Sequence, residues 1–195
     1  GAAIAIGMAQ AGAEVAIMAR SREGLERVAE RIRADGGRCT AIACDVTDTG
    51  SLRRAIAGMA RLDVLVNNAG TNFPEPMVEV SDEHLDTMLA LNVRSVYLAA
   101  QAAVRKMLED AQRRDRGGVI LNMSSQMGHV GSPNRTVYCM TKHAVEGLTK
   151  ALAVELAPQG IRVNSIAPTF VDTPLVRRVV NTPERREFVM SRIPM

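Results

Sequence analysis

Apolar and polar positions along this chain switch repeatedly between extended and helical periodicity. Short apolar runs bounded by turn residues predict strands at residues 14–19, 39–44, 64–66, 119–123 and 162–166. The longer segments between them predict helices at residues 1–12, 21–34, 48–60, 81–110 and 136–157, with a partly helical tail to residue 195. Strands that alternate with helices form a parallel sheet covered by helices. We therefore expect a single, doubly wound α/β domain over residues 1–195, in which helices form the two outer layers and the sheet the middle layer (αβα).

Composition and charge add limits to this picture. The chain has 195 residues, of which 47% are hydrophobic, enough for one sizeable core. The net charge is only +3, and the basic residues are scattered along the chain, with two local arginine clusters at residues 113–116 and 177–186. We interpret the first as a solvated turn and the second as a solvated helix face, because a nucleic-acid surface needs a continuous basic patch with interleaved aromatics. Nucleic acid is therefore excluded as a partner.

The cysteines and the hydropathy pattern bear on location. Cys39, Cys44 and Cys139 are odd in number and show no C-x-x-C spacing, which argues against a disulfide framework or a zinc site. No run of about eighteen apolar residues occurs, so no membrane span is expected. We expect a cytoplasmic protein without a bound metal.

Two helical segments, residues 99–108 and 144–157, carry apolar residues on more than one face. Such helices are buried on two sides, either inside a domain or at a subunit contact. We favour the subunit contact, and hence a homo-oligomer.

The sharpest chemical signal is Tyr138-Cys139-Met140-Thr141-Lys142 at the start of a helix. The i, i+4 spacing places the phenol and the ammonium one turn apart on the same face. A cation about 4 Å away is worth up to about 4 kcal/mol at an effective dielectric of 20, which would lower the phenol pKa towards working pH. Alternatively, the two residues form an ordinary exposed pair.

Two further signals follow predicted strands, at the edge where parallel α/β sheets bind ligands. Ser125 comes just after the strand at 119–123, where its hydroxyl could hold a substrate oxygen or merely cap the strand end. Asn67-Asn68-Ala69-Gly70 follows the strand at 64–66, and its small residues would let a ribose approach the backbone, unless it is a simple turn.

Taken in order, these motifs resemble the short-chain dehydrogenase/reductase family over the whole chain. They comprise Asn-Asn-Ala-Gly at 67–70, Asn92 in a helix, Ser125, Tyr138-x-x-x-Lys142 thirteen residues later, then Asn164 and Pro168. The resemblance implies a Rossmann-like fold. It also implies an NAD(P)-dependent enzyme that transfers hydride between nicotinamide and a carbonyl or secondary alcohol, and a homotetramer.

The resemblance further implies roles for matching positions. Tyr138 would be the general acid or base, Lys142 would lower its pKa and bind the nicotinamide ribose, and Ser125 would orient the substrate oxygen. Asn92 would hold a helix bend and a water that relays protons to Lys142. The remaining cofactor contacts would come from Gly1, Arg20, Ser21, Arg22, Asp45, Val46, Asn67, Ala69, Gly70, Pro168 and Thr173.

The chain also departs from the family pattern. Only Gly1 aligns with the family's glycine-rich pyrophosphate turn, so we expect the first strand and the C-terminal end of the domain to lie outside this sequence. The helix after Asp48 is about one turn shorter than usual, through a true deletion or a missing stretch. Thr169 stands where a glycine commonly follows the family proline.

The end of the strand at 14–19 bears on cofactor choice. Members that prefer NAD usually carry an acid there, whereas this chain has Ala19 followed by Arg20-Ser21-Arg22. Two arginines and a hydroxyl suit a 2′-phosphate, so we favour NADP(H) over NAD(H). Arg20 could instead stack on the adenine of either cofactor.

The substrate is less determined by sequence. Polar residues near the serine, namely Gln126, His129 and Asn134, favour small polyhydroxy substrates, as in gluconate or polyol dehydrogenases, although His129 could simply face solvent. A 3-oxoacyl-thioester (ACP) reductase shares nearly all the motifs. A dinucleotide-sensing regulator would typically lack Tyr138 or Lys142, and a Ser125 hydrolase would need a G-x-S-x-G elbow that is absent.

Overall fold

The computed structural model describes residues 1–173, 176–177 and 180–191, without the side chains of residues 185 and 188. The strands are β1 (Val15–Ala19), β2 (Cys39–Ala43), β3 (Val64–Asn67), β4 (Gly118–Met123) and β5 (Ile161–Ile166). The α-helices are α1 (Ala2–Gln10), α2 (Arg22–Ala34), α3 (Thr49–Ala57), α4 (Asp82–Leu89), α5 (Ser95–Leu108), α6 (Arg113–Arg116), α7 (Thr136–Leu156) and α9 (Pro183–Met190). Shorter helical turns are η1 (Met77–Glu79), η2 (Ala90–Arg94), η3 (Gln126–Gly128) and η4 (Ala157–Gln159).

Side-chain caps explain where several helices begin. The oxygens of Ser21, Asp48 and Ser81 accept backbone N–H groups from the first turns of α2, α3 and α4. All five predicted strands are present, with no end shifted by more than one residue. The third helix is shorter than expected, because it ends at Ala57 rather than near residue 60.

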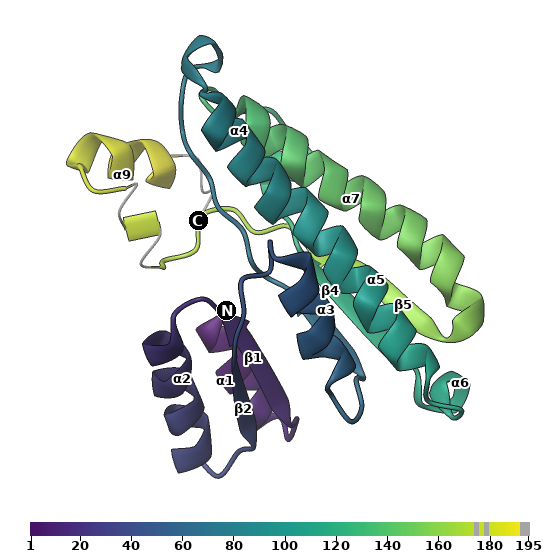
Figure 1. Ribbon diagram of the computed structural model, residues 1–195. Helices are drawn as coiled ribbons and strands as arrows, with labels where there is room; N and C mark the ends of the chain where they lie inside the picture. Colours follow the sequence, from purple (N-terminus) through teal and green to yellow (C-terminus); the bar gives the residue numbers. More distant parts are fainter. Residues whose placement is uncertain (174–175, 178–179, 192–195) are drawn as a thin grey trace.

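Every strand pair is parallel, and helices flank the strands (Figure 1). Hydrogen bonds divide the strands into two sheets, β1-β2 and β3-β4-β5, instead of the one continuous sheet expected from sequence. Helices α1 and α2 accompany the first sheet, whereas α4, α5 and α7 lie beside the second (Figure 1). The carboxyl ends of β3, β4 and β5 therefore share one edge, and the loops that follow them meet there.

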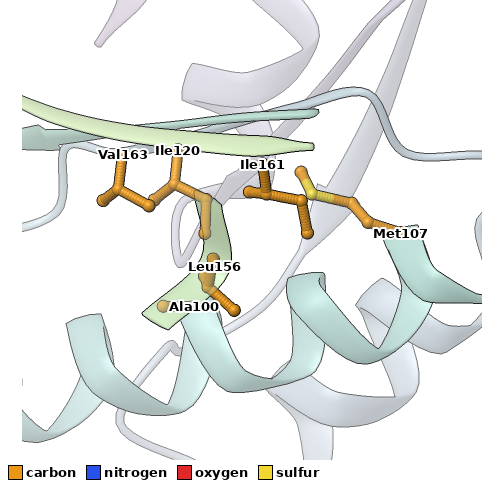
Figure 2. Packing of buried hydrophobic residues seen from close by; sticks show 6 residues of the cluster. All are labelled: Ala100, Met107, Ile120, Leu156, Ile161 and Val163. Carbon is orange, nitrogen blue, oxygen red and sulfur yellow. The ribbon is translucent and has the colours of Figure 1, made fainter. Parts of the chain in front are cut away.

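The main core lies between the second sheet and α5. Figure 2 shows Ile120, Ile161 and Val163 pointing from β4 and β5 towards the helix that carries Ala100 and Met107. These side chains are almost fully buried, so their packing anchors the sheet whose edge carries the candidate site. No helix within the described ranges is long and apolar enough to cross a membrane.

The helical region expected over residues 81–110 contains a π-helical turn, η2, between α4 and α5. One sequence-based expectation needs correction. The cluster at 113–116 is not a fully solvated turn, because the Arg113 side chain is buried and donates to the carbonyls of Met107, Leu62 and Gly117. The hydrogen bonds of Arg113 therefore stabilise the turn that precedes β4. In the second cluster Arg177 pairs with Asp172, as expected of an exposed side chain, while Arg178 and the side chain of Arg185 lie outside the described residues.

Candidate active site

Ser125 and Tyr138 meet at the carboxyl end of β4. Ser125 lies two residues after the end of the strand at Met123 and caps η3, where its hydroxyl accepts the N–H of Met127 at 3.2 Å. Tyr138 lies in the first turn of α7, and a hydrogen bond joins the two side chains. Ser125 is buried and Tyr138 is half-buried, so the two hydroxyls are shielded from bulk water. This pair can hold one ligand oxygen between them.

Lys142 lies one helical turn after Tyr138 and is also buried. Its Nζ donates to the Met123 carbonyl at 2.8 Å and lies 5.6 Å from the centroid of the Tyr138 ring. The two side chains therefore share a face of α7, as the i, i+4 spacing predicts.

The pKa directions at this pair differ from the sequence-based expectation. Burial raises the pKa of Tyr138 above its usual value, and its hydrogen bond with Ser125 offsets this only in part. Burial also lowers the pKa of Lys142 from 10.5 to about 8. The direction of the Tyr138 shift is thus set by burial and not by the ammonium of Lys142, and the expected lowering of the phenol pKa by Lys142 stays a prediction.

Asn92 lies in the π-helical turn and is fully buried. Its side-chain amide accepts the N–H of Thr71 and donates to the Thr71 carbonyl, both at 2.8 Å, and it donates to the Thr141 hydroxyl at 3.2 Å. The helix irregularity expected at this residue is present, and π-turns often occur at functional positions. Asn92 thus connects the loop after β3 to α7 through hydrogen bonds. Its predicted role in holding a water that relays protons to Lys142 stays a prediction.

The loop after β3 comes close to Lys142. A Cβ added at Gly70 would lie 3.2 Å from Asn92 Oδ1 and 3.8 Å from Lys142 Nζ, so a side chain there would crowd both groups. Ala69 and Gly70 are exposed, which leaves their backbone open to a ligand. Asn67 differs: it is buried, and its amide donates to Asn122 at 2.9 Å. Its side chain therefore stabilises the sheet by joining β3 to β4.

The residues predicted to hold the adenosine half lie mainly at the ends of β1 and β2. Arg20 is close enough to Asp45 to help lower the carboxyl pKa, although hydrogen bonds from Thr47 contribute more. Ser21 is committed to the cap of α2, and Arg22 begins that helix. Val46 packs partly buried against the core.

Gly1 lies near the loop after β3, because a Cβ added there would be 3.0 Å from Asn68 Nδ2. Gly1 and Lys142 therefore both lie close to the loop that follows β3.

The remaining predicted residues lie around or after the turn formed by residues 125–128, which we call the serine turn. Gln126 donates its backbone N–H to the Pro168 carbonyl at 3.0 Å, which brings Pro168 beside the site. His129 is half-exposed and lies 3.4 Å from a Glu146 oxygen. Asn134 has a positive φ of 58°, and its carbonyl accepts the Glu75 N–H. Thr173 is farther along, where its hydroxyl accepts the N–H of Val176.

Sequence reasoning overlooked several residues that support the site. Thr141 binds Asn92, and Asn122 links Asn67 to Thr149 of α7 through 2.9 Å hydrogen bonds. Glu146 is buried beside the serine turn. The i, i+4 rule that paired Tyr138 with Lys142 also points to Glu146, so a longer reading of the same helix face would have found it.

Comparisons with known proteins agree with this geometry. A family model for the short chain dehydrogenases matches residues 1–184. L-xylulose reductase from Bos taurus is 36% identical over 185 residues, covering 95% of this chain and 72% of that protein. D-threitol dehydrogenase from Mycolicibacterium smegmatis is 38% identical over 187 residues, covering 94% and 70%. The crystal structure of a gluconate 5-dehydrogenase from Burkholderia cenocepacia, in complex with NADP and tartrate, has a TM-score of 0.90 and 30% identity, covering 100% of this chain and 76% of that one. The resemblance inferred from the motifs is thus confirmed: this chain belongs to the short-chain dehydrogenase family, and it is an oxidoreductase that acts on CH–OH groups.

Proposed function

We propose that this protein transfers hydride between NADP(H) and a small polyhydroxy carbonyl or alcohol, a polyol or sugar acid, through Ser125, Tyr138 and Lys142. The observation that carries the proposal is the joint placement of these residues. The Ser125–Tyr138 hydrogen bond lies at the end of β4, and Lys142 lies one turn along α7, close to Gly70. The Ser125 hydroxyl, the Tyr138 phenol and the Lys142 ammonium thus lie together in one largely buried part of the site.

The chemistry of the chain's own residues is proton transfer and orientation. In the direction of reduction, Tyr138 Oη donates a proton to the carbonyl oxygen, and the Ser125 hydroxyl donates a hydrogen bond to the same atom. A raised pKa keeps the phenol protonated at neutral pH, which is the form that a general acid requires. In the direction of oxidation the phenolate form of Tyr138 accepts the alcohol proton instead, and the phenol is regenerated. A bound nicotinamide dinucleotide supplies or accepts the hydride.

The residues present fit such a cofactor. Exposed Ala69 and Gly70 leave backbone free for a ribose beside the Lys142 ammonium, and an added Cβ at Gly70 would obstruct this approach. At the other sheet, Arg20 is exposed at the end of β1. Ala19, also exposed, adds no negative charge there, so the local groups favour a 2′-phosphate over a free hydroxyl.

Replacing Ala19 by Asp tests this cofactor preference. The new carboxylate should repel a 2′-phosphate, and the ratio of kcat/KM for NADPH to that for NADH should fall about tenfold or more. The matched control is Ala60→Asp, which adds the same charge before β3, at the opposite edge of the second sheet. An unchanged ratio in Ala19→Asp would contradict the assignment.

The substrate class is tested by turnover of the full-length protein with NADPH and with NADH, followed by absorbance. The panel comprises sugar acids, polyols and their ketones, an unfunctionalised cyclic secondary alcohol, and 3-oxoacyl thioesters. We expect the highest kcat/KM among the polyhydroxy compounds, because Gln126 and His129 surround the serine turn with polar groups. Preference for the thioesters would favour the acyl reductase instead, and binding of NADPH without turnover would favour a regulator.

We further propose a cytoplasmic homo-oligomer, a tetramer as the family resemblance implies. Support comes from apolar side chains left exposed on α5 and α7, among them Tyr97, Leu108, Met140 and Val154. Large apolar side chains exposed on two neighbouring helices are a feature that a subunit contact would cover.

A further inference from the structure

Helix α7 presents polar side chains at successive turns to the strands and loops beside it. Tyr138 binds Ser125, Lys142 binds the Met123 carbonyl, and Thr149 accepts from Asn122. Glu146 occupies the turn between Lys142 and Thr149 on the same face, and it is only 7% exposed. The proposed mechanism gives this buried carboxylate no role, although burying a charge is costly unless it is paired.

The carboxylate of Glu146 joins α7 to two other parts of the fold. Its Oε2 accepts the Ser165 hydroxyl of β5 at 3.0 Å, and its Oε1 lies 3.4 Å from Nε2 of His129, in the loop after η3. Burial raises the pKa of Glu146. The neighbouring hydroxyls of Ser124 and Ser165, together with the charges of His129 and Lys150, outweigh this and hold the pKa below its usual value. Glu146 is therefore ionised at neutral pH.

The serine turn packs directly on Glu146. A Cβ added at Gly128 would lie 3.0 Å from Glu146 Cγ, 3.0 Å from the Lys142 carbonyl and 2.8 Å from Ser124 Oγ. The Gly128 N–H in turn donates to the Ser125 carbonyl at 2.8 Å. Only glycine therefore fits at residue 128, where the backbone lies close to Glu146 and Ser124, and the Gly128–Ser125 hydrogen bond connects this backbone to Ser125.

We propose that Glu146 is a positioning residue for Ser125: its carboxylate ties α7 to β5 and to the loop after η3, and so holds the Ser125 hydroxyl against the Tyr138 phenol. The inference rests on the proposed function of Ser125. Displacing a catalytic group by about 1 Å can reduce a rate by about 100-fold, so a modest loosening of this turn has a measurable effect.

Kinetics of the full-length protein test this with Glu146→Leu, Glu146→Gln and the control Glu155→Gln, an exposed glutamate near the end of α7. Glu146→Leu removes both oxygens and should lower kcat about tenfold or more, with the KM for NADPH within about twofold of wild type. Glu146→Gln keeps an acceptor for Ser165 and should recover kcat to within about threefold. Equal losses in Glu146→Leu and Glu155→Gln would overturn the proposal.

A double-mutant cycle separates positioning from general damage. In a Ser125→Ala background there is no hydroxyl left to place, so Glu146→Leu should change kcat by less than about twofold. If the same tenfold loss persisted in that background, Glu146 would not act through Ser125, and the proposal would be wrong.

Hydrogen exchange supplies a readout that does not depend on turnover. Glu146→Leu should speed amide exchange at residues 124–130 while leaving α5 unchanged, because only the local turn loses its support. Unchanged exchange at 124–130, or equal acceleration in α5, would overturn the inference. If wild type turned over nothing in the panel, the proposed function would fail, and exchange at 124–130 would still decide whether Glu146 holds the turn.

Discussion

The two sides of α7 differ from those of a simple covering helix: buried polar groups accompany the buried Val137, Val145 and Leu156 on the inner side, and several apolar residues are exposed on the outer side. The inner face carries Tyr138, Lys142, Glu146 and Thr149, of which all but Tyr138 are fully buried. The outer face carries Met140, Ala144, Gly147, Ala151 and Val154, all exposed. In a helix that served only to cover a sheet, the apolar face would point inward.

This mixture indicates that each face has a task in addition to core packing. Each buried polar group on the inner face has a partner across the helix boundary: a hydroxyl, a carbonyl or an amide. Burial with partners is the condition under which polar groups hold a fixed geometry. The outer face, by contrast, offers small apolar side chains over which a second surface can pack closely. Three predictions sharpen this contrast, in decreasing order of expected effect.

Removal of the phenol hydroxyl should have the largest effect. Tyr138→Phe keeps the ring and loses the proton donor, so kcat should fall about 10³-fold, with the affinity for NADPH within a few-fold of wild type. Steady-state kinetics and cofactor titration measure both quantities. Tyr97→Phe is the matched control, because Tyr97 is half-exposed on α5 and should tolerate the change. A turnover rate of Tyr138→Phe near that of wild type would refute the acid–base role.

Removal of the buried ammonium should change how stability depends on pH. The folded-state pKa of Lys142, about 8, lies below the unfolded value of 10.5. Between these values the unfolded chain binds more protons, so the free energy of unfolding rises with pH across this window, by at most about 3 kcal/mol. Lys142→Met should lack this rise when both proteins are unfolded by urea at pH 7.5 to 10.5. Parallel curves would show that Lys142 titrates normally.

A charge added to the outer face of α7 should weaken self-association and leave the catalytic groups unchanged. Val154 is 80% exposed, and Val154→Arg should weaken self-association about tenfold, about 1.4 kcal/mol, while sparing the inner face. Light scattering across a dilution series measures the change. Val78→Arg is the control, because Val78 is 90% exposed in η1, away from α7. If both variants associate like wild type, the outer face of α7 is not a subunit contact.

The amino-acid sequence by itself determined the elements and the chemistry they carry. Caps such as Ser21 and Asp48 are local, because a side-chain oxygen reaches N–H groups only two or three residues away. The Tyr138–Lys142 pairing also follows from helix geometry alone, and Ser125 falls at a strand end wherever that strand pairs. These features need no knowledge of distant segments, which is why a linear pattern predicts them.

Tertiary structure decided what each group experiences. Whether Arg113 is buried depends on the Leu62 carbonyl, 51 residues away in sequence, and Asn92 is committed to Thr71 and Thr141 by packing of α4, α5 and α7. The pKa of Tyr138 rises rather than falls, because burial outweighs the effects of the Ser125 hydroxyl and of the Arg135 charge. Desolvation is set by how many atoms the rest of the chain places around a group. Spacing along the chain carries no record of that number, so only the folded arrangement reveals it.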